Sequence, residues 1–297
     1  MNRRQGIIAL TFAALAWSSS YVIIKATLGQ IGPFGLSAIR LIIGWLVLLP
    51  IAWKQGFRFK LMVKGRYWLF GLTGVALFQG LQNLGLAYTS ALNVSLILAA
   101  VPAVVTLFAI LFLRERVSWI HYIGLGLTAV GAAIISIAPG ADTHSVNALL
   151  GNLITIGAIV AWASYTIQGK QLVSEHPAVV ITEASLTSGF IMLLPFAFGE
   201  WLIKGPPHLT WSGFLAILYL GAIPLALTTV LWNQALRTVK ASVAGLYINL
   251  IPVLGVIIAL GIGETMSMSQ GIGGAMTLVG VWLSTWASRN TEQAEVS

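Results

Sequence analysis

Hydrophobic residues run along this chain in long, nearly continuous blocks that are separated by short polar connections. Each block has about 20 residues, the length that an α-helix needs to cross the hydrocarbon core of a membrane. Strands fit less well, because apolar strands are shorter and because lipid cannot satisfy an open sheet edge. The pattern predicts ten membrane helices, at 7–28, 33–53, 67–88, 92–113, 119–138, 150–170, 178–199, 211–232, 242–263 and 269–288.

Composition supports a membrane protein and excludes a soluble one. Of the 297 residues, 58% are hydrophobic and only 8% are charged, whereas a soluble domain carries about 25% charged residues. The chain contains no cysteine, which excludes disulfides and thiolate metal sites. We expect neither a metal nor a cofactor.

The basic residues predict the orientation of the helices. If the N-terminus is cytoplasmic, all of the 16 Lys and Arg residues except Lys25, Lys204 and Arg40 lie on the cytoplasmic side. Such an excess follows the positive-inside rule. We therefore expect a multi-pass protein of a bacterial-type inner membrane with both termini in the cytoplasm. The basic loops would contact lipid headgroups, so the net charge of +8 does not call for a nucleic-acid partner.

The second half of the chain repeats polar and proline residues of the first at a nearly constant spacing. The matched pairs are Trp17 and Trp162, Lys25 and Lys170, Pro50 and Pro195, Asn83 and Asn233, Pro102 and Pro252, and Glu115 and Glu264. Because each repeat has five helices, an odd number, the second would enter the membrane from the opposite side. The sequence thus predicts an all-α membrane protein with two inverted repeats, 1–140 and 147–289, and a polar cytoplasmic tail, 290–297. Inverted repeats are typical of secondary transporters.

On these motifs the chain resembles the EamA-type branch of the drug/metabolite transporter (DMT) superfamily. The resemblance rests on an Ala-Trp-x-Ser-Tyr-like start of each repeat, on Pro102 followed by Leu113-Arg114-Glu115-Arg116, and on a glycine-rich last helix. The second copy has Pro252 and Gly263-Glu264, so a glycine replaces Arg114. The resemblance implies ten helices, alternating access and, commonly, export of amino acids or other metabolites.

Polar side chains inside the predicted helices are candidates for the substrate pathway, because lipid does not tolerate them well. Gln79, Gln82 and Asn83 share one helical face, and their amides can both donate to and accept from a polar substrate. Hydrogen bonding between helices is the alternative for these amides, and a lipid-interface position is the alternative for the tryptophans. The other candidates to line a central cavity are Trp17, Ser20, Tyr21, Trp162, Tyr165, Asn233, Tyr247 and Asn249.

Four charged residues and two prolines are further candidates. Lys25, Arg40, Lys170 and Glu183 are candidates for the pathway. Arg40 and Glu183 would either pair or lie near opposite mouths of the pathway, and Arg40 could hold a substrate carboxylate. Glu115 and Glu264 are expected to be structural residues at helix ends. Pro102 and Pro252 would act as hinges or as static kinks.

We therefore expect a secondary transporter that moves a small polar metabolite such as an amino acid, and the resemblance implies that it exports this metabolite. A channel or a lipid scramblase is the alternative. An intramembrane enzyme is less favoured, because the chain has no His-Glu-x-x-His motif and its only aspartate is Asp142; a scaffold is the remaining class. The expected partners are a small-molecule substrate and the bilayer, and small-residue faces such as Gly255-x-x-x-Ala259 leave room for a homodimer.

Overall fold

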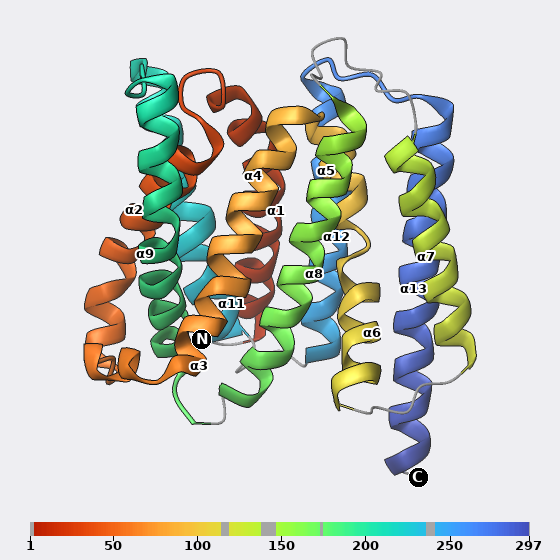
Figure 1. The fold of residues 1–297 in the computed structure, drawn as a ribbon. Coiled ribbons are helices and arrows are strands. Elements are labelled where there is room, and N and C mark those ends of the chain that lie inside the picture. Colours follow the sequence, from red (N-terminus) through yellow and green to blue (C-terminus); the bar gives the residue numbers. More distant parts are fainter. Residues whose placement is uncertain (1–2, 114–118, 138–146, 173–174, 236–240, 297) are drawn as a thin grey trace.

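The computed structural model of the chain is a bundle of helices that run side by side (Figure 1). It describes residues 3–113, 119–137, 147–172, 175–235 and 241–296, and no strand occurs within these ranges. The all-α fold that the hydrophobic blocks predict is therefore confirmed. Figure 1 shows that α1 begins and α13 ends at the lower end of the bundle.

The helices follow the predicted hydrophobic blocks, and three blocks each consist of shorter elements joined end to end. In chain order the elements are α1 (Arg3–Thr27), α2 (Pro33–Lys54), η1 (Phe59–Val63), α3 (Gly65–Gly71), η2 (Leu72–Leu77), α4 (Phe78–Tyr88), α5 (Ala91–Leu98), α6 (Val101–Leu113), α7 (Trp119–Ile137), α8 (Ala148–Leu172), α9 (Ala178–Lys204), α10 (Trp211–Leu220), η3 (Gly221–Leu227), α11 (Thr228–Ala235), α12 (Ala241–Gly261) and α13 (Met268–Val296). The polar tail that the sequence predicts after 289 continues α13 as a helix.

Side-chain caps and prolines fix several helix starts. Ser90 accepts a hydrogen bond from the Asn93 backbone N–H at 3.0 Å at the start of α5. Thr210 does the same for the Gly213 N–H at 3.1 Å at the start of α10. Pro33 occupies the first turn of α2, where its missing N–H costs no helical hydrogen bond. These starts are therefore set by local sequence.

Seven helical stretches among the described residues are long and apolar enough to cross a membrane. They are Arg4–Thr27, Pro33–Lys54, Gly65–Tyr88, Ala91–Phe112, Ala148–Gly169, Ala178–Lys204 and Trp211–Leu231. A shorter apolar helix covers Trp119–Ile135, and α12 and α13 cover the last two predicted blocks. The chain is therefore a multi-pass membrane protein.

Helices of the first half pack on helices of the second half throughout the bundle. α2 lies along α9, and α7 lies along α13. α8 packs against α4, α5 and α6, whereas α1 packs against α11 and α12. Each set of contacts crosses between the two halves, so the two halves of the chain share one core.

Two π-helical segments, η2 and η3, occupy equivalent places in the sequence repeat. A glycine lies at the start of each. A Cβ at Gly71 would lie 2.8 Å from the Ser185 carbonyl oxygen, and a Cβ at Gly221 would lie 2.9 Å from the Arg40 carbonyl oxygen. At Gly71 the chain approaches the backbone of α9, and at Gly221 it approaches the backbone of α2. Both approaches are too close for a residue that has a Cβ. A π-helical turn within an α-helix often marks a functional region.

The fourth predicted block is broken just before Pro102. α5 ends at Leu98 and α6 begins at Val101, so this proline lies in the first turn of α6 and not in the interior of a helix. The expected mid-helix position is corrected, because the chain accommodates the proline by starting a new helix. α12 is continuous through Pro252, whose side chain lies outside the described part. The hinge role of both prolines stays a prediction.

Candidate functional site

Asn83 lies at the centre of a buried polar contact between α2 and α4. Its Nδ2 donates to the Ser37 hydroxyl at 2.7 Å, and that hydroxyl also lies 3.4 Å from the Gln79 carbonyl oxygen. Asn83 is fully buried, and its Oδ1 has no hydrogen-bond partner among the described residues. Gln82, the residue directly before Asn83, is also buried. Two of the three predicted amides therefore face protein and not lipid.

Arg40 lies one turn after Ser37 on α2 and is 5% exposed. Its Nε and Nη1 are buried without a partner among the described residues. Tyr21 on α1 is the titratable side chain with which the Arg40 charge interacts, so these two predicted site residues are brought together. A permanently charged guanidinium thus lies in the bundle, and among the described residues no carboxylate pairs with it.

Aromatic rings of α8 form a stack with those of α3 and α4. The Tyr165 ring is stacked on Phe70, with centroids 4.1 Å apart. The Trp162 ring lies 5.0 Å from Tyr165 and 4.6 Å from Phe78. Trp162 and Tyr165 therefore face the first half of the chain, as the prediction that they line a central space requires. Phe70 and Phe78 were not among the site residues predicted from the sequence.

Two of the predicted residues on α1, Trp17 and Ser20, also face inward. The Trp17 Nε1 donates to the Pro224 carbonyl oxygen in η3 at 2.7 Å. Pro224 lies inside that π-helical segment, so Trp17 ties α1 to the second half of the chain. The Ser20 hydroxyl is buried and donates to Ala16 one turn earlier at 2.9 Å, which meets its polar requirement locally.

Lys25 has a structural contact where the sequence placed it in the pathway. Its Nζ donates to the carbonyl oxygens of Leu86 at 2.9 Å and Thr89 at 2.5 Å. These carbonyls belong to the last turn and the end of α4, where a cation also interacts favourably with the helix dipole. The structure therefore shows Lys25 joining α1 to the end of α4.

Glu183 and Arg40 do not form an ion pair. Glu183 on α9 is fully buried, and neither carboxylate oxygen has a hydrogen-bond partner within the described ranges. α2 and α9 run in opposite directions, because Gly35 meets Glu200 and Trp45 meets Thr187. Arg40 therefore lies toward one end of α9 and Glu183 toward the other. Of the two arrangements that the sequence left open, positions toward opposite ends fit the structure.

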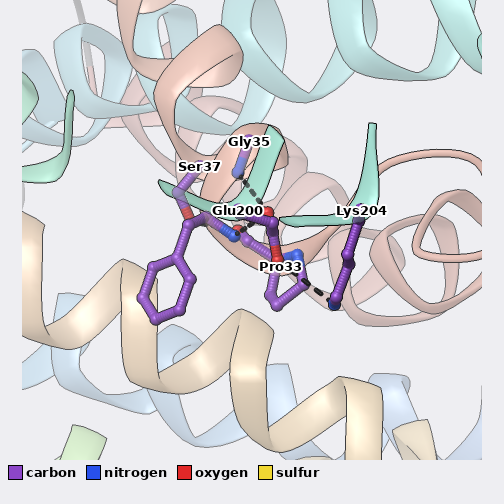
Figure 2. Close-up of polar contacts among 6 residues, drawn as sticks. Pro33, Gly35, Ser37, Glu200 and Lys204 are labelled. Carbon is purple, nitrogen blue, oxygen red and sulfur yellow. Dashed lines mark hydrogen bonds and ion pairs between the residues drawn. The ribbon is translucent and has the colours of Figure 1, made fainter. Parts of the chain in front are cut away.

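Two carboxylates of the second half hold helix starts of the first half. Glu200 accepts from the backbone N–H groups of Phe34 at 3.1 Å and Gly35 at 2.9 Å (Figure 2). Glu264 accepts from those of Ala91 at 3.1 Å and Leu92 at 2.8 Å. A carboxylate at a helix start satisfies free N–H groups and the helix dipole together. The structural role expected for Glu264 is confirmed, whereas Glu200 was not predicted.

Replacing Glu200 with alanine is expected to lower the free energy of unfolding by about 1–3 kcal/mol, because two N–H groups of α2 lose their acceptor. Thermal unfolding in detergent measures this as a lower Tm. Lys204→Ala is the matched control, since its amine lies 3.5 Å from Glu200 and is 64% exposed, so a change below about 0.5 kcal/mol is expected. Equal Tm shifts for the two variants would contradict the capping role.

An exposed ion pair links the halves at the opposite end of the bundle. Arg66, at the start of α3, donates both guanidinium branches to the carboxylate of Glu175, which precedes α9. The Arg66 guanidinium holds the pKa of Glu175 below its ordinary value, mainly through these hydrogen bonds. Both side chains are well exposed, at 39% and 44%.

Several predicted site residues lie outside what the structure describes. The side chains of Lys170, Asn233, Tyr247 and Asn249 belong to this group. Within the described ranges no group of three or more His, Asp or Glu side chains could hold a metal ion. The site that can be described is therefore the inward-facing set on α1, α2, α4 and α8, and Ser37 is the member that the sequence did not suggest.

Comparison with known proteins adds a family and several named relatives. The model of the EamA-like transporter family matches the chain twice, at residues 4–137 and 149–286. A probable terminal-alkyne amino-acid exporter of Streptantibioticus cattleyicolor is 28% identical over 95% of this chain and 94% of its own length. A probable amino-acid metabolite efflux pump of Salmonella typhimurium is 24% identical over the whole of both chains.

One solved structure has the same fold. It has a TM-score of 0.65 and 19% sequence identity, and the match covers 98% of this chain and 100% of that one. The likeness therefore extends over nearly the full length of the bundle and concerns the fold alone.

Proposed function

We propose that this chain, which belongs to the EamA-like transporter family, carries a small polar metabolite across the membrane by alternating access between two inverted repeats. The observation that supports this best is the double match of the family model, at 4–137 and 149–286. Two equivalent halves of this kind are typical of secondary transporters. Two copies of one unit that enter a membrane from opposite sides can exchange conformations and so open to either side in turn.

The packing of the helices supports inverted repeats of five spans each. The close contact of Gly71, in the first half, with Ser185, in the second, has its equivalent in the contact of Gly221, in the second half, with Arg40, in the first. The ten spans of the proposal are the seven membrane-length stretches together with α7, α12 and α13. Residues 1–140 and 147–289 form the repeats in this proposal.

An amino acid or a similar metabolite is the substrate class that we propose, and export is the direction. Two of the relatives are named as a probable terminal-alkyne amino-acid exporter and a probable amino-acid metabolite efflux pump. The described site favours a polar substrate, since Gln82, Asn83 and Arg40 are buried between α1, α2 and α4. Aromatic rings at Trp162 and Tyr165 would pack on its apolar part.

Counterflow in proteoliposomes tests the carrier. Vesicles with the purified protein are loaded with unlabelled compounds from a panel of amino acids, amines, nucleosides and sugars, and uptake of the same labelled compound is followed. A carrier gives saturable uptake that overshoots when the compound is also inside. Non-saturable flux would indicate a channel, and movement of labelled phospholipid between leaflets would indicate a scramblase.

Both termini are expected to be cytoplasmic and the connection between Asp142 and Asn147 periplasmic. The reason is the excess of Lys and Arg in the connections on the side of the termini. Reporter fusions at each terminus and an insertion after Asp142, expressed in a bacterial inner membrane, measure the location of each. A cytoplasmic signal from the insertion would mean an even number of spans in the first repeat, and the inverted arrangement would then be wrong.

A further inference from the structure

Arg40 is a buried cation for which the described part of the chain provides no counter-ion. It is 5% exposed, and two of its three guanidinium nitrogens, Nε and Nη1, lack a hydrogen-bond partner among the described residues. The buried carboxylate on α9, Glu183, lies toward the other end of the α2–α9 contact, beyond the level of Trp45 and Thr187. The side chain that interacts with its charge is the phenol of Tyr21. An unpaired buried charge in a membrane protein has a high free-energy cost. A ligand that pairs with Arg40 would offset this cost.

An unsatisfied acceptor lies close to this cation. Ser37 and Arg40 are three residues apart on α2, about 4.5 Å along the helix axis and on one face. The Ser37 hydroxyl is bonded to Asn83 Nδ2 at 2.7 Å, which orients the Asn83 amide. The other end of that amide, Oδ1, is buried without a partner. Facing helices thus present free cationic donors and a free acceptor, about one helical turn apart.

We propose that Arg40 binds the carboxylate of the substrate and that Asn83 Oδ1 accepts a hydrogen bond from its ammonium group. The proposal deepens the proposed function, on which it rests, by naming the substrate as a zwitterionic α-amino acid and by assigning the residues that recognise its charged groups. A guanidinium matches a carboxylate in charge and geometry. An amide oxygen is a suitable acceptor for an ammonium N–H.

The two charged groups of an α-amino acid are separated by a single carbon, so the pair of free groups on α2 and α4 suits a compact substrate. Phe78 of α4, with the ring of Trp162 against it at 4.6 Å, lies about one turn before Gln82 and Asn83 on the same helix. The side chain of the amino acid would extend toward these rings. Ser37 would serve as a positioning residue, since it contacts the amide and not the substrate.

The test compares substrates with and without a carboxylate. The probe is a radiolabelled mixture of the protein amino acids in the counterflow assay, and the competitors are the same amino acids, their C-terminal amides and their N-acetyl derivatives. We expect wild-type protein to be inhibited by free amino acids at least about tenfold more strongly than by amides or N-acetyl forms, since either change leaves a buried group unpaired. Arg40→Gln should remove the preference over amides, and Arg40→Lys should keep part of it.

Stability separates recognition from a merely structural role. Because Arg40 Nε and Nη1 have no hydrogen-bond partner to lose among the described residues, Arg40→Leu should leave the Tm of the substrate-free protein unchanged or raised while it abolishes amino-acid counterflow. Arg58→Gln is the control, since Arg58 donates to the backbone carbonyls of Trp53 and Phe57 beyond the end of α2, and it should change neither. Amino-acid counterflow that survives Arg40→Leu, or a Tm lowered by that variant, would overturn the proposal.

The same assay keeps the two proposals apart. If wild-type protein carries compounds of the panel that have no carboxylate, and Arg40→Gln carries them equally well, the carrier function stands and the assignment of Arg40 is wrong. If wild-type protein shows counterflow of no compound in the panel, the proposed function itself fails, and the assignment of Arg40 fails with it.

Discussion

We expect the largest loss of stability from Gly131→Leu and from Gly280→Leu. A Cβ at Gly131 would lie 2.5 Å from the Gly273 carbonyl oxygen, and one at Gly280 would lie 2.5 Å from the Gly124 carbonyl oxygen. These atoms belong to the backbone and cannot move aside, so α7 and α13 would have to separate. Overpacking of this kind costs about 3 kcal/mol or more.

The measurement is the Tm and the yield of monodisperse protein after extraction into detergent. Gly126 lies on the same helix, and nothing lies within 4 Å of its Cβ position, so Gly126→Leu is the matched control and should behave like wild type. If Gly131→Leu and Gly126→Leu give the same Tm, the close approach of α7 and α13 is not needed for the fold.

Asn83→Leu is expected to lower counterflow about tenfold or more at normal membrane abundance, because the leucine side chain offers no acceptor in a dry site. The same change also removes the hydrogen bond from Asn83 to Ser37. If Asn83 had only a structural role, the loss of this bond would explain the loss of transport. Ser37→Ala deletes that bond and keeps the amide, so it is the matched comparison: because it only removes the group that orients Asn83, it should lower counterflow clearly less than Asn83→Leu does.

Gln82→Leu extends the comparison to the neighbouring buried amide. A smaller decrease in counterflow is expected, because the Gln82 side chain makes no hydrogen bond to α2 among the described residues. Counterflow and quantitative blotting of the membranes are measured together for all three variants. Equal loss of transport in Asn83→Leu and Ser37→Ala would show that Asn83 acts through packing of α2 on α4.

The course of the helices could be read from the sequence, because lipid imposes a nearly fixed length on every apolar segment. The inward position of Trp162, Tyr165 and Asn83 could also be anticipated, since a polar or amphipathic group repeated in both halves has little reason to face lipid. The prediction of one continuous helix over 92–113 did not include the break before Pro102. Proline shows that a helix is disturbed, but whether the chain kinks or restarts depends on how the neighbouring helices pack.

Side-chain partners from distant elements could not be read from the sequence. Lys25 seemed a pathway residue because it repeats as Lys170, yet it reaches the end of α4, which only the packing of α1 reveals. Glu200 was overlooked because a carboxylate near a helix end is usually solvated, and its two N–H donors lie in a segment far away in sequence. Whether Arg40 and Glu183 pair could not be read from the sequence either, because the antiparallel course of α2 and α9 is what separates them.

The charged links between the halves differ in their exposure to ions at the two ends of the bundle. At one end the Glu200 and Glu264 carboxylates are bound to backbone N–H groups, and Glu200 is only 7% exposed. At the other end Arg66 and Glu175 face solvent. With a Debye length of about 8 Å at physiological ionic strength, dissolved salt screens the second link far more than the first. Higher ionic strength is therefore expected to weaken the Arg66–Glu175 link and to leave the Glu200 link largely unchanged.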